Sequence, residues 1–196
     1  MKFPYSFSLL VLVLVSLPKD LHLFCGADPM DDFTSVPLSD KNFDMQTPYN
    51  QPLEDRYKYE DGVRSLWVYD NDKPFKQGSQ ARPRTEIHIK DLDYSSGVWQ
   101  FEGYAFEPHG TSGVTIAQIH GATEVATDLY DKWFRLNIIH NVDDGNVTVF
   151  IDGVQKFVVK DQGPGDLYFK CGIYAAPANS SNYMESRWKG IKIFKK

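Results

Sequence analysis

The feature that most constrains the fold is a succession of short segments in which apolar and polar side chains alternate. Successive side chains of a β-strand point to opposite faces, so this alternation is typical of strands with one dry face and one polar face. The segments follow one another from Gly62 to the C-terminus, separated by turns rich in Gly, Pro and Asp, and no window shows a helical period. The pattern predicts an all-β fold, with antiparallel strands arranged as a two-sheet β-sandwich.

Three of these segments carry strongly polar faces. The polar faces comprise Arg84, Glu86, His88 and Lys90 in the first segment, Gln118 and His120 in the second, and Tyr168, Lys170 and Tyr174 in the third. A solvated outer face is one interpretation, because antiparallel sheets commonly have one polar face. The other is a floor formed by three neighbouring strands, whose cations, amide and imidazoles suit a bound carboxylate. The clustering of these residue types favours the second interpretation.

The N-terminal residues 1–27 have the pattern of a secretory signal peptide. Lys2 precedes an apolar run, Phe7–Leu17, which is shorter than the roughly 20 residues that span a membrane, and Cys25-Gly26-Ala27 offers small residues for cleavage. A signal anchor is the alternative. We expect the mature chain to comprise residues 28–196, with an irregular N-terminal arm over residues 28–60 and one edge strand near Phe43. The protein would be secreted to the cell wall or reach a vacuole by the secretory pathway.

Charge and length exclude some classes of function. The formal net charge is −5, whereas a nucleic-acid-binding protein needs a basic stripe, and no segment after the first 27 residues is apolar enough to cross a bilayer. A chain of 196 residues is expected to form one domain with its own core. We expect a monomer that needs no cofactor.

Cysteine and asparagine residues give three further expectations. Loss of Cys25 with the signal peptide would leave Cys171 as a single cysteine, so no disulfide framework is expected. Cys171 lies on the apolar side of its strand and is therefore expected to be a buried, unreactive side chain. Asn146 and Asn179 each begin an Asn-X-Ser/Thr sequence and are predicted glycosylation sites.

The three polar segments resemble the signature strands of the alginate-lyase-type polysaccharide lyases, family 7 and its relatives. Arg84-Thr85-Glu86-Ile87-His88, Gln118-Ile119-His120 and Tyr168-Phe169-Lys170-Cys171-Gly172-Ile173-Tyr174 are similar to the family patterns R-[ST]-E-L-R, Q-[IV]-H and Y-F-K-x-G-x-Y, in the same order. The resemblance runs from about Asp31 to the C-terminus and extends to plant members of the family that bind citrate. It implies a β-jelly roll with a concave polar groove on one sheet.

The resemblance also implies roles for individual residues. The catalytic residues would be Arg84, Gln118, His120 and Tyr174, and the ligand-binding residues would be Arg84, Glu86, His88, Gln118, His120, Lys170 and Tyr174. In a lyase, Arg84, Gln118 and His120 would hold the uronate carboxylate, where charge develops during proton abstraction. Tyr174 would carry the proton, with His120 as the other candidate base. Glu86 would orient Arg84.

The sequence departs from the family pattern in two places. His88 stands where the family usually has arginine, and a titratable imidazole weakens a bidentate carboxylate clamp. Only residues 122–130 separate the Gln118–His120 segment from the next strand, where the family normally has an additional pair of strands. Either the short connection is natural, or a segment is missing from this sequence. Absence of the additional pair of strands would expose sheet edges and open the wall of the groove.

Two functions share the predicted site. The first is binding of citrate, a similar polycarboxylate or an anionic saccharide; the second is β-elimination of a polyuronate. A third hypothesis is a lectin-like module that uses Tyr104, Trp133 and Tyr183. Glu86 and Glu102 could also form a glycosidase pair. The remaining histidines show no metal-ligand spacing, so we predict no metal site.

Overall fold

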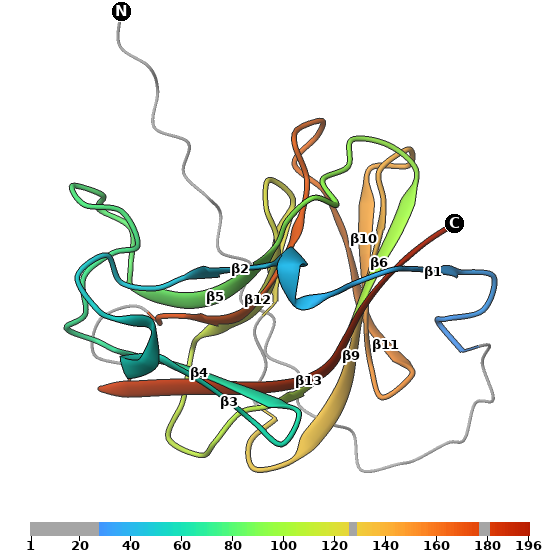
Figure 1. The fold of residues 1–196 in the computed structure, drawn as a ribbon. Coiled ribbons are helices and arrows are strands. Elements are labelled where there is room, and N and C mark those ends of the chain that lie inside the picture. Colours follow the sequence, from blue (N-terminus) through green and yellow to red (C-terminus); the bar gives the residue numbers. More distant parts are fainter. Residues whose placement is uncertain (1–27, 126–128, 177–180) are drawn as a thin grey trace, which may run out of the picture.

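The structure, a computed structural model, describes residues 28–125, 129–176 and 181–196. It confirms the predicted all-β fold, with two antiparallel sheets packed as a sandwich (Figure 1). The larger sheet has eight strands in the order β11–β10–β9–β6–β13–β4–β3, with β1 paired to β13. Its strands are β1 (Thr34–Val36), β3 (Tyr57–Glu60), β4 (Val63–Tyr69), β6 (Val98–Phe106), β9 (Trp133–Asn141), β10 (Asn146–Ile151), β11 (Val154–Lys160) and β13 (Tyr183–Lys195).

The smaller sheet has five strands in the order β2–β5–β12–β7–β8. Its strands are β2 (Phe43–Gln46), β5 (Arg84–Ile89), β7 (Thr115–Ile119), β8 (Thr123–Val125) and β12 (Phe169–Tyr174). Two short 3-10 helices, η1 (Asp40–Asn42) and η2 (Leu53–Asp55), lie in the N-terminal part of the chain. No helix in the described ranges is both long and apolar enough to cross a membrane.

The core lies between the two sheets. Phe101 of β6 and Trp188 of β13 meet edge to face at 5.7 Å between ring centroids, and Phe101 also contacts Phe169 of β12 at 5.9 Å. Burial of each such side chain contributes about 1.5–3 kcal/mol to folding. Phe169 and Cys171 are both buried, as the alternation in their segment predicts. Burial raises the pKa of the Cys171 thiol, which agrees with an unreactive side chain.

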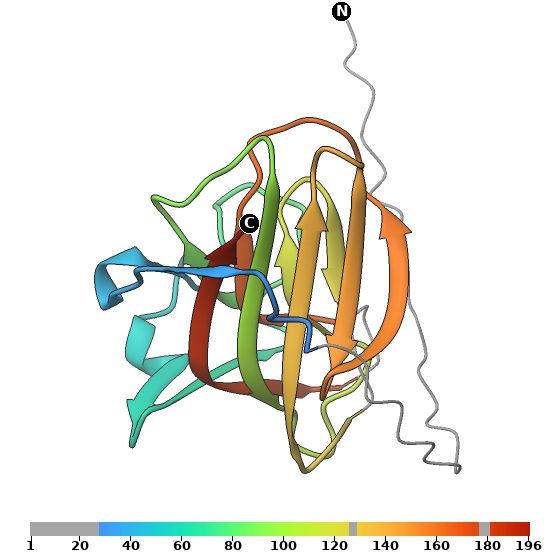
Figure 2. The ribbon, with the colours of Figure 1, turned by 90° about the vertical axis from the view of Figure 1, so that its right-hand side faces the viewer.

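The longest strand, β13, joins several parts of the larger sheet. It pairs with β4 along one edge and with β6 along the other, and its register to β6 shifts between Lys189 and Lys192. Gly190 lies in this shift with a φ of 61°, a left-handed conformation that suits glycine. Figure 2 shows the strands of this sheet side by side after a quarter turn of the molecule.

The N-terminal arm is more regular than the sequence indicates. The predicted edge strand near Phe43 is β2, which lies at the edge of the smaller sheet. The structure adds β1 and β3, which the sequence analysis missed. Both are too short for alternation to be visible, and pairing with β13 and β4 fixes their conformation instead.

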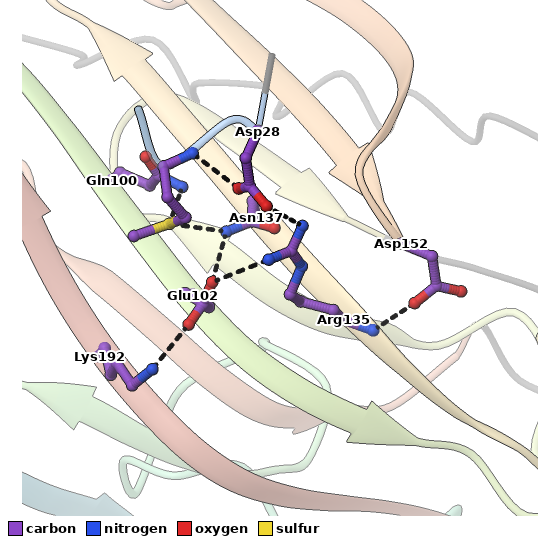
Figure 3. A network of polar contacts seen from close by, with 8 residues as sticks. Asp28, Gln100, Glu102, Arg135, Asn137, Asp152 and Lys192 are labelled. Carbon is purple, nitrogen blue, oxygen red and sulfur yellow. Dashed lines mark hydrogen bonds and ion pairs between the residues drawn. The ribbon is translucent and has the colours of Figure 1, made fainter. Parts of the chain in front are cut away.

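The first described residues lie across the outer face of the larger sheet (Figure 3). The Met30 sulfur accepts hydrogen bonds from the amide of Gln100, at 2.9 Å, and from that of Asn137, at 3.3 Å. Both amide side chains are fully buried although they lie on the outward side of their strands. Residues 28–30 therefore cover polar groups that would otherwise be solvated.

Candidate functional site

The three polar segments lie side by side, as predicted. β12 pairs with β5 on one side and with β7 on the other. Tyr174 lies opposite Arg84, and Lys170 lies opposite both His88 and Gln118. Because paired residues of neighbouring strands point to the same face, the polar side chains of all three strands share one face of the smaller sheet.

Gly172 makes the close approach of β12 to β5 possible. A β-carbon at this position would lie 2.7 Å from the Cα of Glu86 and even closer to the backbone oxygen of Thr85. Its φ of 143° is also unfavourable for other residues. The register between β12 and β7 shifts between Cys171 and Tyr174. The glycine of the third motif therefore sets the position of the strand that carries Lys170 and Tyr174.

Glu86 is the buried centre of the site. Arg84 Nη1 lies 3.3 Å from Glu86 Oε2, Lys170 Nζ lies 3.8 Å from the same oxygen, and Gln118 Nε2 donates to Glu86 Oε1. The Glu86 side chain is 0% exposed, so the structure places it beneath the floor. Its carboxylate orients donors from all three strands, which agrees with the expected orientation of Arg84.

Lys170 is buried and has a second partner from the N-terminal arm. Lys170 Nζ donates a 2.8 Å hydrogen bond to Oε1 of Gln46, which lies in β2. Burial lowers the pKa of Lys170, and the neighbouring charge of Glu86 opposes this shift. Sequence analysis did not identify Gln46, because the segment around it shows no motif and its place beside Lys170 depends on the pairing of β2 with β5.

Two imidazoles lie against one tyrosine ring. The rings of His120 and Tyr168 are stacked at 4.6 Å between centroids, with 16° between their planes, and His88 lies 4.0 Å from the same ring. Burial lowers the pKa of both histidines, and the charge of Lys170 lowers it further. Both imidazoles are therefore mainly neutral near pH 7 and can act as hydrogen-bond partners for a ligand.

His88 also lies near two carboxylates. Its Nδ1 is 3.8 Å from Asp44 Oδ2, and its Nε2 is 3.9 Å from Asp93 Oδ1. These distances exceed those of good hydrogen bonds. His88 thus lies at the border of the floor, and it does not form the bidentate clamp that an arginine could provide.

Tyr174 lies at the other end of the floor. The guanidinium carbons of Arg84 and Arg82 lie 4.4 Å and 4.7 Å from its ring centroid. Arg84 therefore contacts Tyr174 and Glu86 at once and links the tyrosine to the buried carboxylate. Arginines therefore supply the cations beside the Tyr174 ring, whereas Lys170 donates its hydrogen bond to Gln46.

These residues form an open groove with a volume of about 240 Å³. Its walls come from the smaller sheet and from the connection between β4 and β5. The lining residues are Gln46, Phe75, Lys76, Ser79, Ala81, Arg84, His120, Tyr168 and Lys170. Among the predicted site residues, Arg84, His120 and Lys170 line the groove directly. Four lining residues belong to an irregular loop without a periodic pattern and could not be predicted from the sequence: Phe75, Lys76, Ser79 and Ala81.

The other hypothetical sites differ from this groove. Glu102 lies on the outer face of the larger sheet, where it contacts Lys192 at 3.0 Å and Asn137 at 3.1 Å (Figure 3). A glycosidase pair of Glu86 and Glu102 is therefore wrong, because the two carboxylates belong to different sheets. Within residues 28–125, 129–176 and 181–196, no group of three or more His, Cys, Asp or Glu residues could hold a metal ion.

The residues of the lectin-like hypothesis lie on the larger sheet. Tyr104 and Tyr183 are each 39% exposed, and Trp133 is partly buried, with the Lys189 ammonium 4.2 Å from its ring centroid. Of the predicted glycosylation sites, Asn146 begins β10 and is partly exposed, whereas Asn179 lies outside the described residues.

Comparison with known proteins supports the resemblance. The family model with the description "Alginate lyase" (Alginate_lyase2) matches residues 36–131 and 122–195. These two matches overlap at the connection that the sequence analysis singled out as short. A "Citrate-binding protein" from Hevea brasiliensis is 57% identical over 215 aligned positions, which cover 98% of this chain and 90% of the relative. Because the alignment has more positions than this chain has residues, the relative carries additional residues.

Solved structures show the same fold. The alginate lyase AlgAT5 of polysaccharide lyase family 7 has a TM-score of 0.60 at 17% identity, covering 79% of this chain and 95% of the lyase. The alginate lyase from Corynebacterium sp. has a TM-score of 0.57 at 16% identity, covering 70% of this chain and 80% of the lyase. At these identities the likeness concerns the fold alone. The match to the family model over most of the chain, together with the Hevea relative, shows that this chain belongs to the alginate lyase family.

Proposed function

We propose that this protein binds citrate or a similar small polycarboxylate or anionic saccharide in the groove of the smaller sheet. The observation that carries the proposal is the composition of the groove. Three cations, Lys76, Arg84 and Lys170, line it, and one buried carboxylate, Glu86, lies beneath them. The local charge is positive although the whole chain has a net charge of −5. A local basic site of this kind can capture an anion without help from the overall field.

The size of the groove supports a small ligand. Pockets for drug-sized ligands have volumes of roughly 300–1,000 Å³, whereas this groove has about 240 Å³. The amide of Gln46 and the imidazole of His120 add neutral polar groups that can fix the orientation of a ligand. The Hevea relative, which is named for citrate binding, supports the same class of ligand.

The experiment is calorimetric titration of the protein with citrate. Arg84→Ala removes a partly buried cation from the groove and should weaken binding by roughly 2–5 kcal/mol, the usual cost of losing one partner of a desolvated charge pair. Arg187→Ala is the matched control, because Arg187 lies on the larger sheet and its side chain is 40% exposed. Unchanged affinity of the Arg84→Ala variant would refute binding in this groove.

The second candidate function is β-elimination of a polyuronate. The arrangement of Tyr174 favours it, because the guanidinium groups of Arg82 and Arg84 lie against its ring and place two cations beside the residue that would carry the proton. His120 lines the groove and supplies a second base with a lowered pKa. A lyase would release unsaturated uronates, which absorb ultraviolet light. This absorbance should vanish in Tyr174→Phe and persist in Tyr104→Phe, an exposed tyrosine of the larger sheet; no absorbance with the wild type over a panel of polyuronates would exclude the activity.

We also propose that residues 1–27 direct the protein into the secretory pathway, to the cell wall or a vacuole. The apolar run Phe7–Leu17 and the small residues before Asp28 support this. N-terminal sequencing of protein isolated from its source should find Asp28 as the first residue. An intact Met1 would contradict the cleavage.

Glycosylation at Asn146 and Asn179 can be tested separately. Treatment with an N-glycosidase should lower the mass of the wild-type protein, and this decrease should be smaller in the Asn146→Gln and Asn179→Gln variants.

A further inference from the structure

We infer that Lys76 makes the groove selective for ligands with three carboxylates over ligands with two. This inference rests on the proposed function of the groove and assigns a specificity-determining role to a residue of the β4–β5 connection. Lys76 lines the same groove as Arg84 and Lys170 but comes from an irregular loop outside both sheets. No family motif of the sequence includes this residue.

The loop that carries Lys76 is held in place at its start. Asp72 follows β4 and forms a bidentate ion pair with Arg56, with distances of 2.8 Å to Nε and 2.6 Å to Nη2. The Asp72 side chain is only 3% exposed, and its Oδ2 also accepts the backbone N–H of Tyr69. This buried, bidentate contact fixes the direction in which the loop leaves the larger sheet.

Two backbone hydrogen bonds fix the middle of the loop. The N–H of Tyr49 donates to the oxygen of Pro74 at 3.0 Å, and the N–H of Ser79 donates to the oxygen of Lys76 at 3.1 Å. The second bond closes a turn in which Gly78 has a φ of 79°, a conformation that glycine adopts readily. Lys76 therefore begins a defined turn at the groove wall, so its backbone is already ordered before its ammonium contacts a ligand.

The charges of the groove show why this residue matters. Arg84 and Lys170 share the carboxylate of Glu86, so the floor by itself has an excess of one positive charge. Lys76 is exposed, and no carboxylate of the described residues forms an ion pair with it. Its charge is among the causes that lower the pKa of Lys170, which places its ammonium within electrostatic range of the floor. Together with the floor, Lys76 gives the groove an excess of two positive charges, and its ammonium remains available to a ligand.

A third carboxylate is the ligand group that this position recognises. Two carboxylates can contact Arg84 and Lys170 at the floor, and a third, on the same small molecule, can extend toward the loop. The hydroxyl of Ser79 lines the groove beside the same turn and can donate to that carboxylate. A dicarboxylate lacks the third carboxylate, so contact with Lys76 adds little to its binding affinity.

The test compares two ligands that differ by one carboxylate. Tricarballylate has three carboxylates on a three-carbon chain, and glutarate has the outer two. Calorimetric titration of the full chain with both ligands should show that Lys76→Ala weakens tricarballylate binding by about threefold to fivefold, and glutarate binding by less than about twofold. Lys76→Arg should retain the selectivity, because it keeps the charge.

Lys73→Ala is the matched control. Lys73 is an exposed lysine of the same loop, but it does not line the groove, so its removal should leave both affinities unchanged. Equal effects of Lys76→Ala on both ligands, or no effect on either, would overturn the role of Lys76 while citrate binding by the wild type stands. Failure of the wild type to bind any of these carboxylates would overturn the proposed function together with this inference.

Discussion

Lys170 and Gln46 are 124 residues apart in sequence, and Lys170 Nζ donates a 2.8 Å hydrogen bond to Oε1 of Gln46 inside the protein. Lys170 is 3% exposed, and Gln46 is 8% exposed. The bond joins the third polar motif to an edge strand of the N-terminal arm. It gives the buried ammonium a neutral acceptor in addition to Glu86, and it ties the arm to the floor of the groove.

Replacement of Gln46 by leucine should destabilise the protein and weaken ligand binding. The buried ammonium of Lys170 would lose a hydrogen-bond acceptor, which costs about 1–3 kcal/mol. Urea denaturation measures this change as a lower midpoint with an unchanged slope. Gln155→Leu is the control, because Gln155 is exposed on β11. Equal midpoints for the two variants would show that the Lys170–Gln46 bond contributes little.

Glu86→Gln should be among the most destabilising substitutions of the groove. The change leaves Arg84 and Lys170 close together without their shared carboxylate, and breaking a buried pair in this way costs about 3–5 kcal/mol. Thermal unfolding should show a fall of the midpoint by about 6–20 °C, given about 2–4 °C per kcal/mol at this size. Glu60→Gln, at a side chain that is 62% exposed, should unfold like the wild type. A variant as stable as the wild type would show that Glu86 is not needed as a counter-charge.

Gly172→Ala should disrupt the groove sheet. The new methyl group would contact the backbone of β5 at the Cα of Glu86, and the φ of 143° is strained for alanine. Overpacking alone costs roughly 1–3 kcal/mol, and the backbone strain adds to it. Gly165→Ala provides the comparison, because no atom lies within 4 Å of its added β-carbon. Measured free energies of unfolding should differ by at least about 1 kcal/mol between the two variants; similar values would contradict the close approach of β12 to β5.

Stability should fall as the pH is lowered through the range in which an unfolded histidine becomes charged. The pKa of His88 and of His120 in the folded protein lies below the ordinary value of 6.5, mainly because of burial. Below pH 6.5 the unfolded chain therefore binds more protons than the folded protein, and the equilibrium shifts toward unfolding; above pH 6.5 this contribution is fully retained. Denaturation between pH 5 and pH 8 should show this slope, and His120→Gln should reduce it.

The same histidines predict the direction of proton exchange on binding. A bound polyanion favours the charged form of His120, so complex formation should take up protons near pH 6. Titrations with citrate in buffers of different ionisation enthalpy measure this uptake. The difference between wild type and His120→Gln isolates the imidazole from the ligand's own protons. Identical proton uptake in both proteins would show that His120 does not respond to the ligand.

Much of the site could be predicted because alternation is a local property. The faces assigned to Arg84, Glu86 and His88, and the apolar side of the Cys171 segment, agree with the structure. The three motifs also indicated that their strands lie together. The burial of side chains on the polar face could not be predicted, because periodicity indicates which face of a sheet a side chain occupies but not which residues cover it. Glu86 is thus buried beneath the floor rather than displayed on it, and Lys170 lines the groove with only 3% of its surface exposed.

The sequence by itself determined the class of the fold, the two faces of each strand and the residue types that meet at the groove, since a period of two follows from strand geometry alone. Only the tertiary structure decided which charged side chains form ion pairs with one another and which remain available to a ligand. Pairing of β2 with β5 brings Gln46 to Lys170, and the irregular connection between β4 and β5 brings Lys76 to the same groove. The contact between Gln46 and Lys170 joins residues that are 124 positions apart in sequence, and the loop has no periodic pattern, so no local pattern could encode either placement.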